Sequence, residues 1–267
     1  MRGPTIGVFD SGFGGLTVLR KLLPLIPGAH YIYLGDTARL PYGSKSQATI
    51  ARYAVESARF LESHGADHLV IACNTATALA LPEIVASVTV PVTGVIGPVV
   101  HATYDQHPEA DTLILATSAT VESHAYRTLC AERGLRPTEK ACPLLVPLIE
   151  EGWIEHAVTR DVLRIYLREA LAICNPRVVI LGCTHYPLIS ALVSDILIEL
   201  GSDAVVIDSA QATAAAVASR YSEAAPASEA SVTFACYATD STEKFARLGS
   251  QFLGQPIPGV ELLDLGG

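Results

Sequence analysis

Short apolar segments alternate along this chain with longer segments of helical periodicity, and this alternation constrains the fold more than any other feature. In residues 47–64 and 160–172, apolar side chains recur every three or four positions, which is typical of amphipathic helices. Strands are predicted at 5–9, 31–34, 69–72, 92–95, 113–116, 178–181, 204–207 and 232–237. Strands this apolar are buried on both faces, as in parallel sheets covered by helices. The predicted fold class is therefore α/β with mostly parallel sheets.

The two halves of the chain repeat one local pattern around a cysteine. The run Val70–Ala72 leads into Cys73, Asn74 and Thr75, and a helix is predicted over 76–85. The run Ile180–Gly182 leads into Cys183, Thr184 and His185, and a helix is predicted over 187–197. The repeat indicates two pseudo-symmetric α/β domains.

The domain boundary is predicted near 95–98, where strand 92–95 ends. Residues 222–230, rich in Ser, Ala, Glu and Pro, are predicted to be an exposed linker, after which the last strand and helix return to the first domain. The expected domains are thus 1–95 plus 208–267, carrying Asp10 and Cys73, and 96–207, carrying Glu150, Cys183 and His185.

Ligands of open α/β sheets bind at the carboxyl ends of the strands. Both cysteines, the pair Asp10 and Ser11, and the segment 117–120 fall at such ends. If the two halves face one another, the active site is an interdomain cleft with one thiol on each wall.

A cysteine at a helix start lies near backbone N–H groups and the positive end of the helix dipole, which are expected to lower its pKa. Two such thiols suit racemisation, because a proton leaves one face of Cα and another returns to the opposite face. Asp10 is a candidate hydrogen-bond partner for one thiol. His185, together with the carboxylate of Glu150, is a candidate partner for Cys183.

Neutral hydrogen-bond donors gather in the same turns and loops. They suit the carboxylates of an acidic amino acid, and dense hydrogen bonding to the α-carboxylate lowers the barrier at Cα without a cofactor. These donors are Ser11, Gly12, Tyr42, Gly43, Ser44, Asn74, Thr75, Thr120 and Thr184.

Composition excludes several other classes of protein. The formal net charge is -9 with a pI near 5.3, so nucleic acid is not expected as the primary ligand. No uncharged span of about 20 apolar residues is present, and Asp10 interrupts the first apolar run, so neither a membrane segment nor a signal peptide is predicted. Six cysteines without a CxxC pair fit a reducing, cytoplasmic compartment, with Cys130, Cys142, Cys174 and Cys236 as small core residues.

Over nearly its whole length the sequence resembles the bacterial glutamate racemases. The motifs that carry the resemblance are residues 6–12 with 14–17, 35–37 with 41–43, 72–76, 116–117 with Thr120, 142–152, and 182–187. The resemblance implies a two-domain α/β homodimer without cofactor or metal. Such an enzyme interconverts L- and D-glutamate and supplies D-glutamate for peptidoglycan.

The resemblance also implies roles for individual residues. Cys73 would deprotonate D-glutamate and Cys183 L-glutamate, with Asp10, Glu150 and His185 assisting proton transfer. Substrate contacts would come from Asp10, Ser11, Pro41, Tyr42, Gly43, Asn74, Thr75, Thr120, Thr184 and His185. Ala119 departs from the family, which usually has Gly before this Thr, and Glu151 is an alternative to Glu150.

Four alternatives remain open at this point. A nucleotide-dependent oxidoreductase is suggested by Gly12–Gly15 and Asp36, although the GxGxxG pattern fails at Thr17. A cysteine-nucleophile amidase would use only one of the two thiols. An amino-acid binding module would be inert, and an aspartate racemase would tend to carry an acidic residue at position 185. Pyridoxal-phosphate racemases are disfavoured because none of the four lysines, Lys21, Lys45, Lys140 and Lys244, occupies a convincing Schiff-base position.

Overall fold

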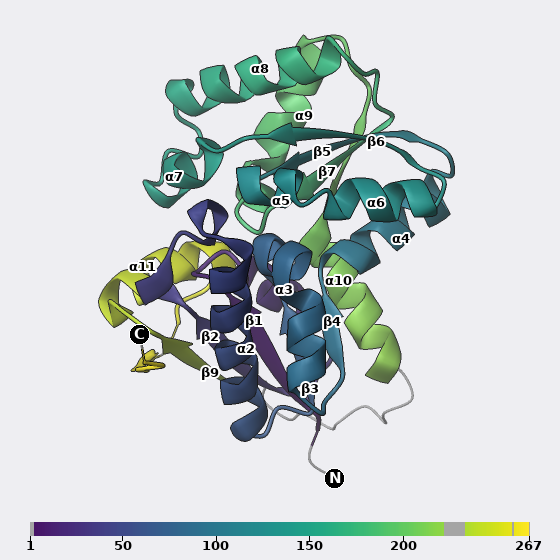
Figure 1. Cartoon of the computed structure of the whole chain (residues 1–267). Helices are drawn as coiled ribbons and strands as arrows, with labels where there is room; N and C mark the ends of the chain where they lie inside the picture. The colour runs from purple at the N-terminus through teal and green to yellow at the C-terminus, as the bar shows by residue number, and fades with distance from the viewer. Residues whose placement is uncertain (1–2, 222–232, 258, 267) are drawn as a thin grey trace. The chain divides into compact units, whose positions relative to one another are not determined.

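The computed structural model describes residues 3–221, 233–257 and 259–266, which form two compact α/β units (Figure 1). The first unit comprises the described residues of 1–95 and 210–267, and the second comprises 96–209. Each unit is built on a parallel sheet, so the predicted fold class is confirmed. Within the described residues, no helix is long and apolar enough to cross a bilayer.

The first unit contains a six-stranded sheet in the order β10-β9-β2-β1-β3-β4, with every neighbouring pair parallel. Its strands are β1 (Thr5–Asp10), β2 (His30–Gly35), β3 (His68–Ile71), β4 (Val92–Gly94), β9 (Thr233–Ala238) and β10 (Glu261–Leu262). Phe9 of β1 lies opposite Leu34 of β2 and Ile71 of β3, so these three strands end together. The residues that follow them, including Asp10 and Cys73, therefore lie at one edge of the sheet.

Helices cover both faces of this sheet (Figure 1). They are α1 (Leu16–Leu22), α2 (Gln47–Ser63), α3 (Asn74–Ser87), α10 (Ser209–Ala218) and α11 (Thr242–Leu253), with 3₁₀ turns η1 (Thr37–Arg39), η2 (Tyr42–Ser44) and η4 (Ser219–Tyr221). Phe9 and Ile71 pack with α2 and α3 in one buried cluster. On the other face Tyr33 packs against Phe245 of α11, and α11 packs against α1. Successive strand residues thus supply two core layers.

The second unit contains a four-stranded parallel sheet in the order β6-β5-β7-β8. Its strands are β5 (Asp111–Ala116), β6 (Arg136–Ala141), β7 (Val178–Gly182) and β8 (Val205–Asp208). This order repeats the order β2-β1-β3-β4 of the first sheet, with β5 in place of β1 and β7 in place of β3. Cys73 follows β3 and Cys183 follows β7, so the two cysteines occupy equivalent positions in the two sheets.

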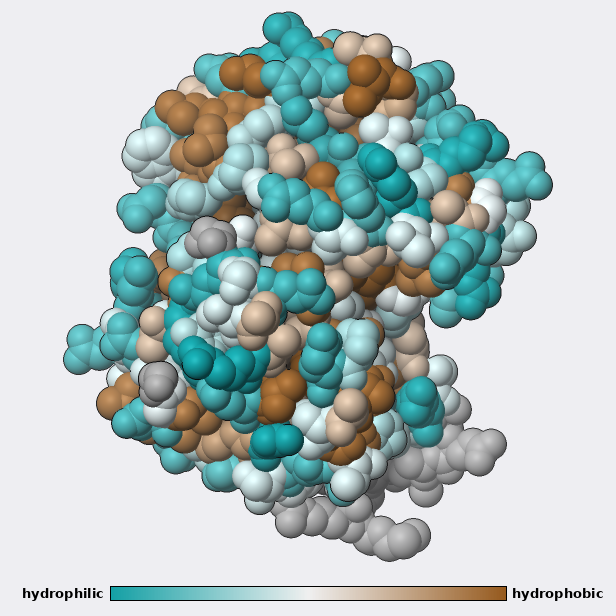
Figure 2. Space-filling model, viewed as in Figure 1, coloured by the Kyte–Doolittle hydropathy of each residue, from teal (hydrophilic) through white to brown (hydrophobic). Residues whose placement is uncertain are grey.

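Helices also cover both faces of the second sheet. They are α4 (Ile96–Gln106), α5 (Ser118–Glu122), α6 (Ala125–Glu132), α7 (Leu145–Glu150), α8 (Ala157–Leu171) and α9 (Ser190–Glu199), with the 3₁₀ turn η3 (Tyr186–Ile189). Helices α8 and α9 pack together on one face, and α4 and α6 on the other (Figure 1). Figure 2 shows apolar surface over the region of α7 and α8, where Leu144, Trp153, Val158 and Ile165 are exposed.

All eight predicted strands overlap strands of the structure, but β6 and β10 were not predicted. β6 has the sequence Arg-Pro-Thr-Glu-Lys-Ala and lies at the edge of its sheet with one neighbour, so its side chains are partly exposed and carry no apolar run. β10 is only two residues long. The predicted linker, 222–230, lies outside the described residues.

The predicted helix after Cys183 was wrong in its first turn. Residues Tyr186–Ile189 form a 3₁₀ turn, and the α-helix begins at Ser190. Tyr186 N–H donates to the Cys183 carbonyl and Leu188 N–H to the His185 carbonyl, while Pro187 has no N–H to donate. Cys183 therefore does not cap an α-helix as Cys73 does.

Candidate active site

Cys73 is held at the junction of β3 and α3. Its side chain is 5% exposed and caps α3 by accepting a hydrogen bond from Ala76 N–H, with Sγ 3.4 Å from the nitrogen. The thiol donates to Ser11 Oγ at 3.5 Å. The sequence expectation that Ser11 and Cys73 share one edge of the sheet is thus met by a direct contact.

Asp10, the last residue of β1, lies beside this thiol and is 1% exposed. Its Oδ2 accepts a hydrogen bond of 2.8 Å from Gly12 N–H, which shapes the turn after the strand. Asp10 does not cap α1, because the cap of that helix is Gly15 and has no side-chain bond. The carboxylate is placed to act on Cys73 through its charge.

The pKa of Cys73 is raised to about 12, mainly by burial and in addition by the negative charge of Asp10. Hydrogen bonding with the Ser11 hydroxyl and with the backbone N–H groups of Ala76 and Ser11 acts in the opposite direction and is outweighed. The prediction that a helix start lowers this pKa was therefore wrong for Cys73. The partial positive charges at the start of α3 do not compensate for the complete burial of the Cys73 thiol next to a carboxylate. The thiol is neutral in the free protein.

Gly15 permits the close approach of α1 to Asp10, which sequence reasoning missed. A Cβ at this position would lie 2.5 Å from Asp10 Cβ and 2.9 Å from Ala72 Cβ. Gly15→Ala should therefore destabilise the fold by about 1–3 kcal/mol in urea unfolding, as overpacking does. Gly97→Ala in α4, where a Cβ meets nothing within 4 Å, is the control and should leave stability unchanged or slightly higher. Equal effects of the two substitutions would contradict this packing argument.

The predicted substrate loop, Pro41–Gly43, contains a buried tyrosine rather than an open one. Tyr42 is 2% exposed, and its hydroxyl donates to Asp36 Oδ2 at 2.6 Å. The Tyr42 hydroxyl thus already has an acceptor within the first unit. Asp36 is 0% exposed, so its carboxylate does not face a ribose as the oxidoreductase alternative requires. Asn74 and Thr75 open α3 directly after Cys73 and are buried.

In the second unit, Cys183, His185 and Glu150 form a chain of polar contacts. Cys183 follows β7 and is 5% exposed, and its Sγ lies 3.9 Å from His185 Nδ1. His185 Nε2 lies 3.0 Å from Glu150 Oε1, and Nδ1 lies 3.4 Å from Thr184 Oγ1. Glu150 is the last residue of α7, whereas Glu151 is exposed. The geometry thus selects Glu150 over Glu151.

The pKa of His185 is raised to about 10 in this environment. Burial lowers the pKa, but the neighbouring Cys183 and Glu150 side chains raise it by more. His185 is therefore an imidazolium at neutral pH, placed between a sulfur and a carboxylate. Such a group can hold a proton for Cys183 or stabilise negative charge on it.

Thr117 and Thr120 lie after β5, at the position in this sheet that corresponds to Asp10 and Ser11 in the other. Thr117 caps α5 by accepting from Thr120 N–H at 3.4 Å, and the two hydroxyl oxygens are 3.0 Å apart. Ala119 lies within α5, where alanine is a favourable residue. Its departure from the family pattern therefore leaves this turn intact.

The remaining cysteines lie outside these hydrogen-bonded clusters, and Cys142 is close enough to Cys183 for the charges of the two thiols to interact. Cys130, Cys142 and Cys236 are buried and Cys174 is half-buried, and all four are free thiols. Among the described residues, no group of three or more His, Cys, Asp or Glu side chains could hold a metal ion.

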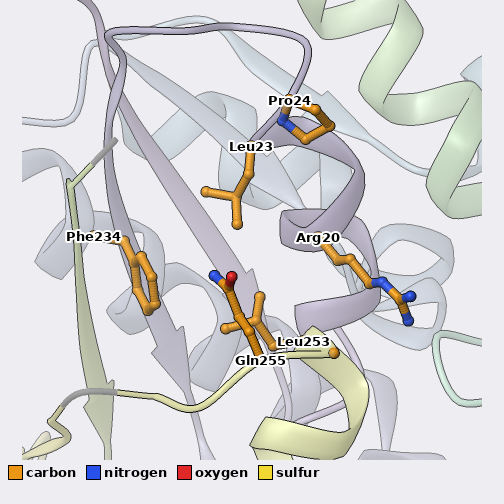
Figure 3. A pocket seen from close by; sticks show the side chains of 7 residues that line it. Arg20, Leu23, Pro24, Phe234, Leu253 and Gln255 are labelled. Carbon is orange, nitrogen blue, oxygen red and sulfur yellow. The ribbon is translucent and has the colours of Figure 1, made fainter. Parts of the chain in front are cut away.

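A separate pocket of about 510 Å³ lies in the first unit (Figure 3). It is lined by Arg20, Leu23, Pro24, Phe234, Leu253, Gly254 and Gln255. These residues come from the ends of α1 and α11 and from the start of β9, hence from the amino edge of the sheet, opposite Cys73. The lining contains no acid or base suited to proton transfer, so this pocket is not the candidate active site.

Comparison with known proteins shows which family the chain belongs to. The sequence model of the Asp/Glu/Hydantoin racemase family matches residues 6–217. The chain is 48% identical to the glutamate racemase of Koribacter versatilis (strain Ellin345), with 99% of this chain and 98% of that protein aligned.

Two solved structures are similar over the same extent. The glutamate racemase of Francisella tularensis in complex with D-glutamate has a TM-score of 0.90 at 32% identity, and the alignment covers 99% of both chains. The glutamate racemase of Thermus thermophilus in complex with β-chloro-D-alanine has a TM-score of 0.86 at 38% identity, covering 99% of this chain and 98% of that one. The chain therefore belongs to the Asp/Glu/Hydantoin racemase family and, within it, to the glutamate racemases.

Proposed function

We propose that this protein interconverts L- and D-glutamate by two-base proton transfer at Cα, with Cys73 and Cys183 as the two bases, and so supplies D-glutamate for peptidoglycan. The observation that carries the proposal is the equivalent placement of two buried cysteines after β3 and β7. Each cysteine has its own titratable neighbour, Asp10 for Cys73 and His185 for Cys183, and Cys73 is also hydrogen-bonded to Ser11.

In the L to D direction, Cys183 removes the Cα proton and Cys73 donates its own proton to the opposite face. The proton balance closes, because Cys183 ends as a thiol and Cys73 as a thiolate. Burial and Asp10 make this Cys73 thiolate a strong base, which suits removal of the weakly acidic Cα proton of D-glutamate in the reverse direction. His185, protonated and bonded to Glu150, stabilises negative charge on Cys183.

In this proposal each of the two domains, 1–95 with 208–267 and 96–207, contributes one thiol. The equivalence of the two sheets supports this division, since it gives each domain one thiol at its ligand-binding edge. In this proposal the substrate contacts are Asp10, Ser11, Pro41, Tyr42, Gly43, Asn74, Thr75, Thr120, Thr184 and His185, and the hydroxyl, amide and backbone N–H groups among them hold its carboxylates. Pro41 and Tyr42 contribute through the backbone or ring, as the Tyr42 hydroxyl is bonded to Asp36.

The test is racemisation by the purified protein with nothing added. After dialysis against a chelator, the protein should convert L-glutamate to D-glutamate and should act much more slowly on L-aspartate. Chiral chromatography measures both conversions. The histidine at position 185 favours glutamate over aspartate, since aspartate relatives tend to be acidic there. Faster turnover of aspartate would replace the proposal with an aspartate racemase, and ammonia release from glutamine would replace it with an amidase.

The cellular setting of the enzyme is also part of the proposal. Peptidoglycan precursors are made in the cytoplasm, so a supplier of D-glutamate is expected there. The family resemblance implies a homodimer, which sedimentation velocity of the purified protein tests directly.

A further inference from the structure

Asp36 is a buried carboxylate of the first unit that the proton transfer described above does not use. It follows β2 directly, is 0% exposed and accepts three hydrogen bonds from side chains. Tyr42 Oη donates to Oδ2 at 2.6 Å, while Arg39 Nε and Thr239 Oγ1 each donate to Oδ1 at 2.9 Å. A buried charge that is fully paired in this way holds its partners in one geometry.

The partners of Asp36 come from three different segments of the first unit. Arg39 also pairs with Glu56 of α2, and its guanidinium lies 4.2 Å from the ring centre of Tyr53 in the same helix. Thr239 follows β9 and accepts a bond of 2.9 Å from Ala38 N–H. Asp36 thus joins the end of β2, helix α2 and the segment after β9.

Tyr42 links this network to Cys73. Its ring packs between Phe9 and Tyr53, with ring centres 6.3 Å and 6.2 Å away, and belongs to the same buried cluster as Cys73. The turn that contains it, η2, packs against α3, the helix that Cys73 caps. The position of residues 41–43 relative to the Cys73 sulfur therefore depends on where Asp36 holds the Tyr42 hydroxyl.

We propose that Asp36 is a positioning residue for glutamate: without touching the substrate, it fixes residues 41–43 beside Cys73 through its bonds to Tyr42, Arg39 and Thr239. This inference rests on the proposed function, which assigns residues 41–43 to the substrate. Loss of the Asp36 bonds lets the loop shift while the two thiols keep their places. Binding of glutamate should therefore weaken more than the chemical step.

The experiment measures steady-state racemisation of glutamate by Asp36→Asn, Tyr42→Phe and the double variant. Each single variant should raise KM roughly 10-fold and lower kcat less than about 3-fold, because the binding geometry is lost rather than a proton donor. The double variant should be no worse than the poorer single variant, because both substitutions break the same bond. Asp111→Asn, which breaks an exposed pair with Arg136 in the second unit, is the control and should leave KM unchanged.

Equilibrium dialysis of labelled D-glutamate supplies a second readout that does not depend on turnover, and its Kd should rise in parallel with KM. Thr239→Val removes one donor from the same carboxylate and replaces Asp36→Asn if that variant does not fold. Unchanged KM and Kd in folded Tyr42→Phe and Thr239→Val, or kcat losses as large as the KM increases, would overturn the positioning role. Absence of racemisation by the wild type in the same assay would instead overturn the proposed function.

Discussion

Cys73→Ala and Cys183→Ala should each abolish racemisation, with kcat/KM falling by about 10³-fold or more, near the upper range for loss of a general acid or base. The loss should be equal for L- and D-glutamate, because enantiomers have equal free energy and the ratio of the two kcat/KM values is fixed at one. Both directions need both thiols, one to take a proton and one to give it. Chiral chromatography of the product from each enantiomer measures the effect.

Cys130→Ala is the matched control for this pair. Cys130 is also buried, and burial raises its pKa to about 12, yet it has no contact with Ser11 or His185. Cys130→Ala should leave kcat/KM within about 3-fold of the wild type. The small cavity that it creates should lower the free energy of unfolding. Comparable activity in all three variants, each with an unchanged circular dichroism spectrum, would contradict the two-thiol account.

His185→Asn should reduce kcat/KM by about 10²-fold, since it removes the cation beside Cys183, and Glu150→Gln should reduce it by about 10-fold. Glu150 and Cys183 hold the pKa of His185 near 10 against the opposing effect of burial. Removing the carboxylate therefore lowers the pKa of His185, so the imidazolium persists only to a lower pH. Activity in Glu150→Gln should accordingly fall at alkaline pH values where the wild type still works.

Glu151→Gln is the control for this prediction because it changes an adjacent but exposed carboxylate of the same helix end. NMR titration of the His185 ring should show a lowered pKa in Glu150→Gln and an unchanged one in Glu151→Gln. If Glu151→Gln changed the pKa of His185 or the rate of racemisation more than Glu150→Gln does, Glu150 would not be the carboxylate that acts on His185.

Much of the fold could be predicted from sequence because the central strands are buried on both faces and therefore consist of consecutive apolar residues. β6 could not, because a strand with one neighbour and partial exposure tolerates Arg, Glu and Lys. It is the counterpart of β2, whose other side is covered by β9. The duplicated halves were thus visible around the two cysteines but not at the sheet edges.

The candidate site could be predicted where the interacting residues are also close in sequence, as Cys183 and His185 are. The pairing of His185 with Glu150 was proposed from sequence, but the choice of Glu150 over Glu151 stayed open because it depends on where α7 ends in space. The direction of the Cys73 pKa shift was also missed, because a helix start can be seen in sequence whereas complete burial beside Asp10 cannot. The Asp36 network joins residues about 200 positions apart, which no local pattern reveals.

Wild-type enzyme given L-glutamate in heavy water provides the most direct test of two thiols on opposite faces of one carbon. At early times, the D-glutamate formed should carry deuterium at Cα, because its new hydrogen comes from a thiol equilibrated with solvent. The remaining L-glutamate should gain deuterium much more slowly than product appears. D-glutamate that retains the original hydrogen would show that a single base carries the same proton across both faces, and would contradict the account.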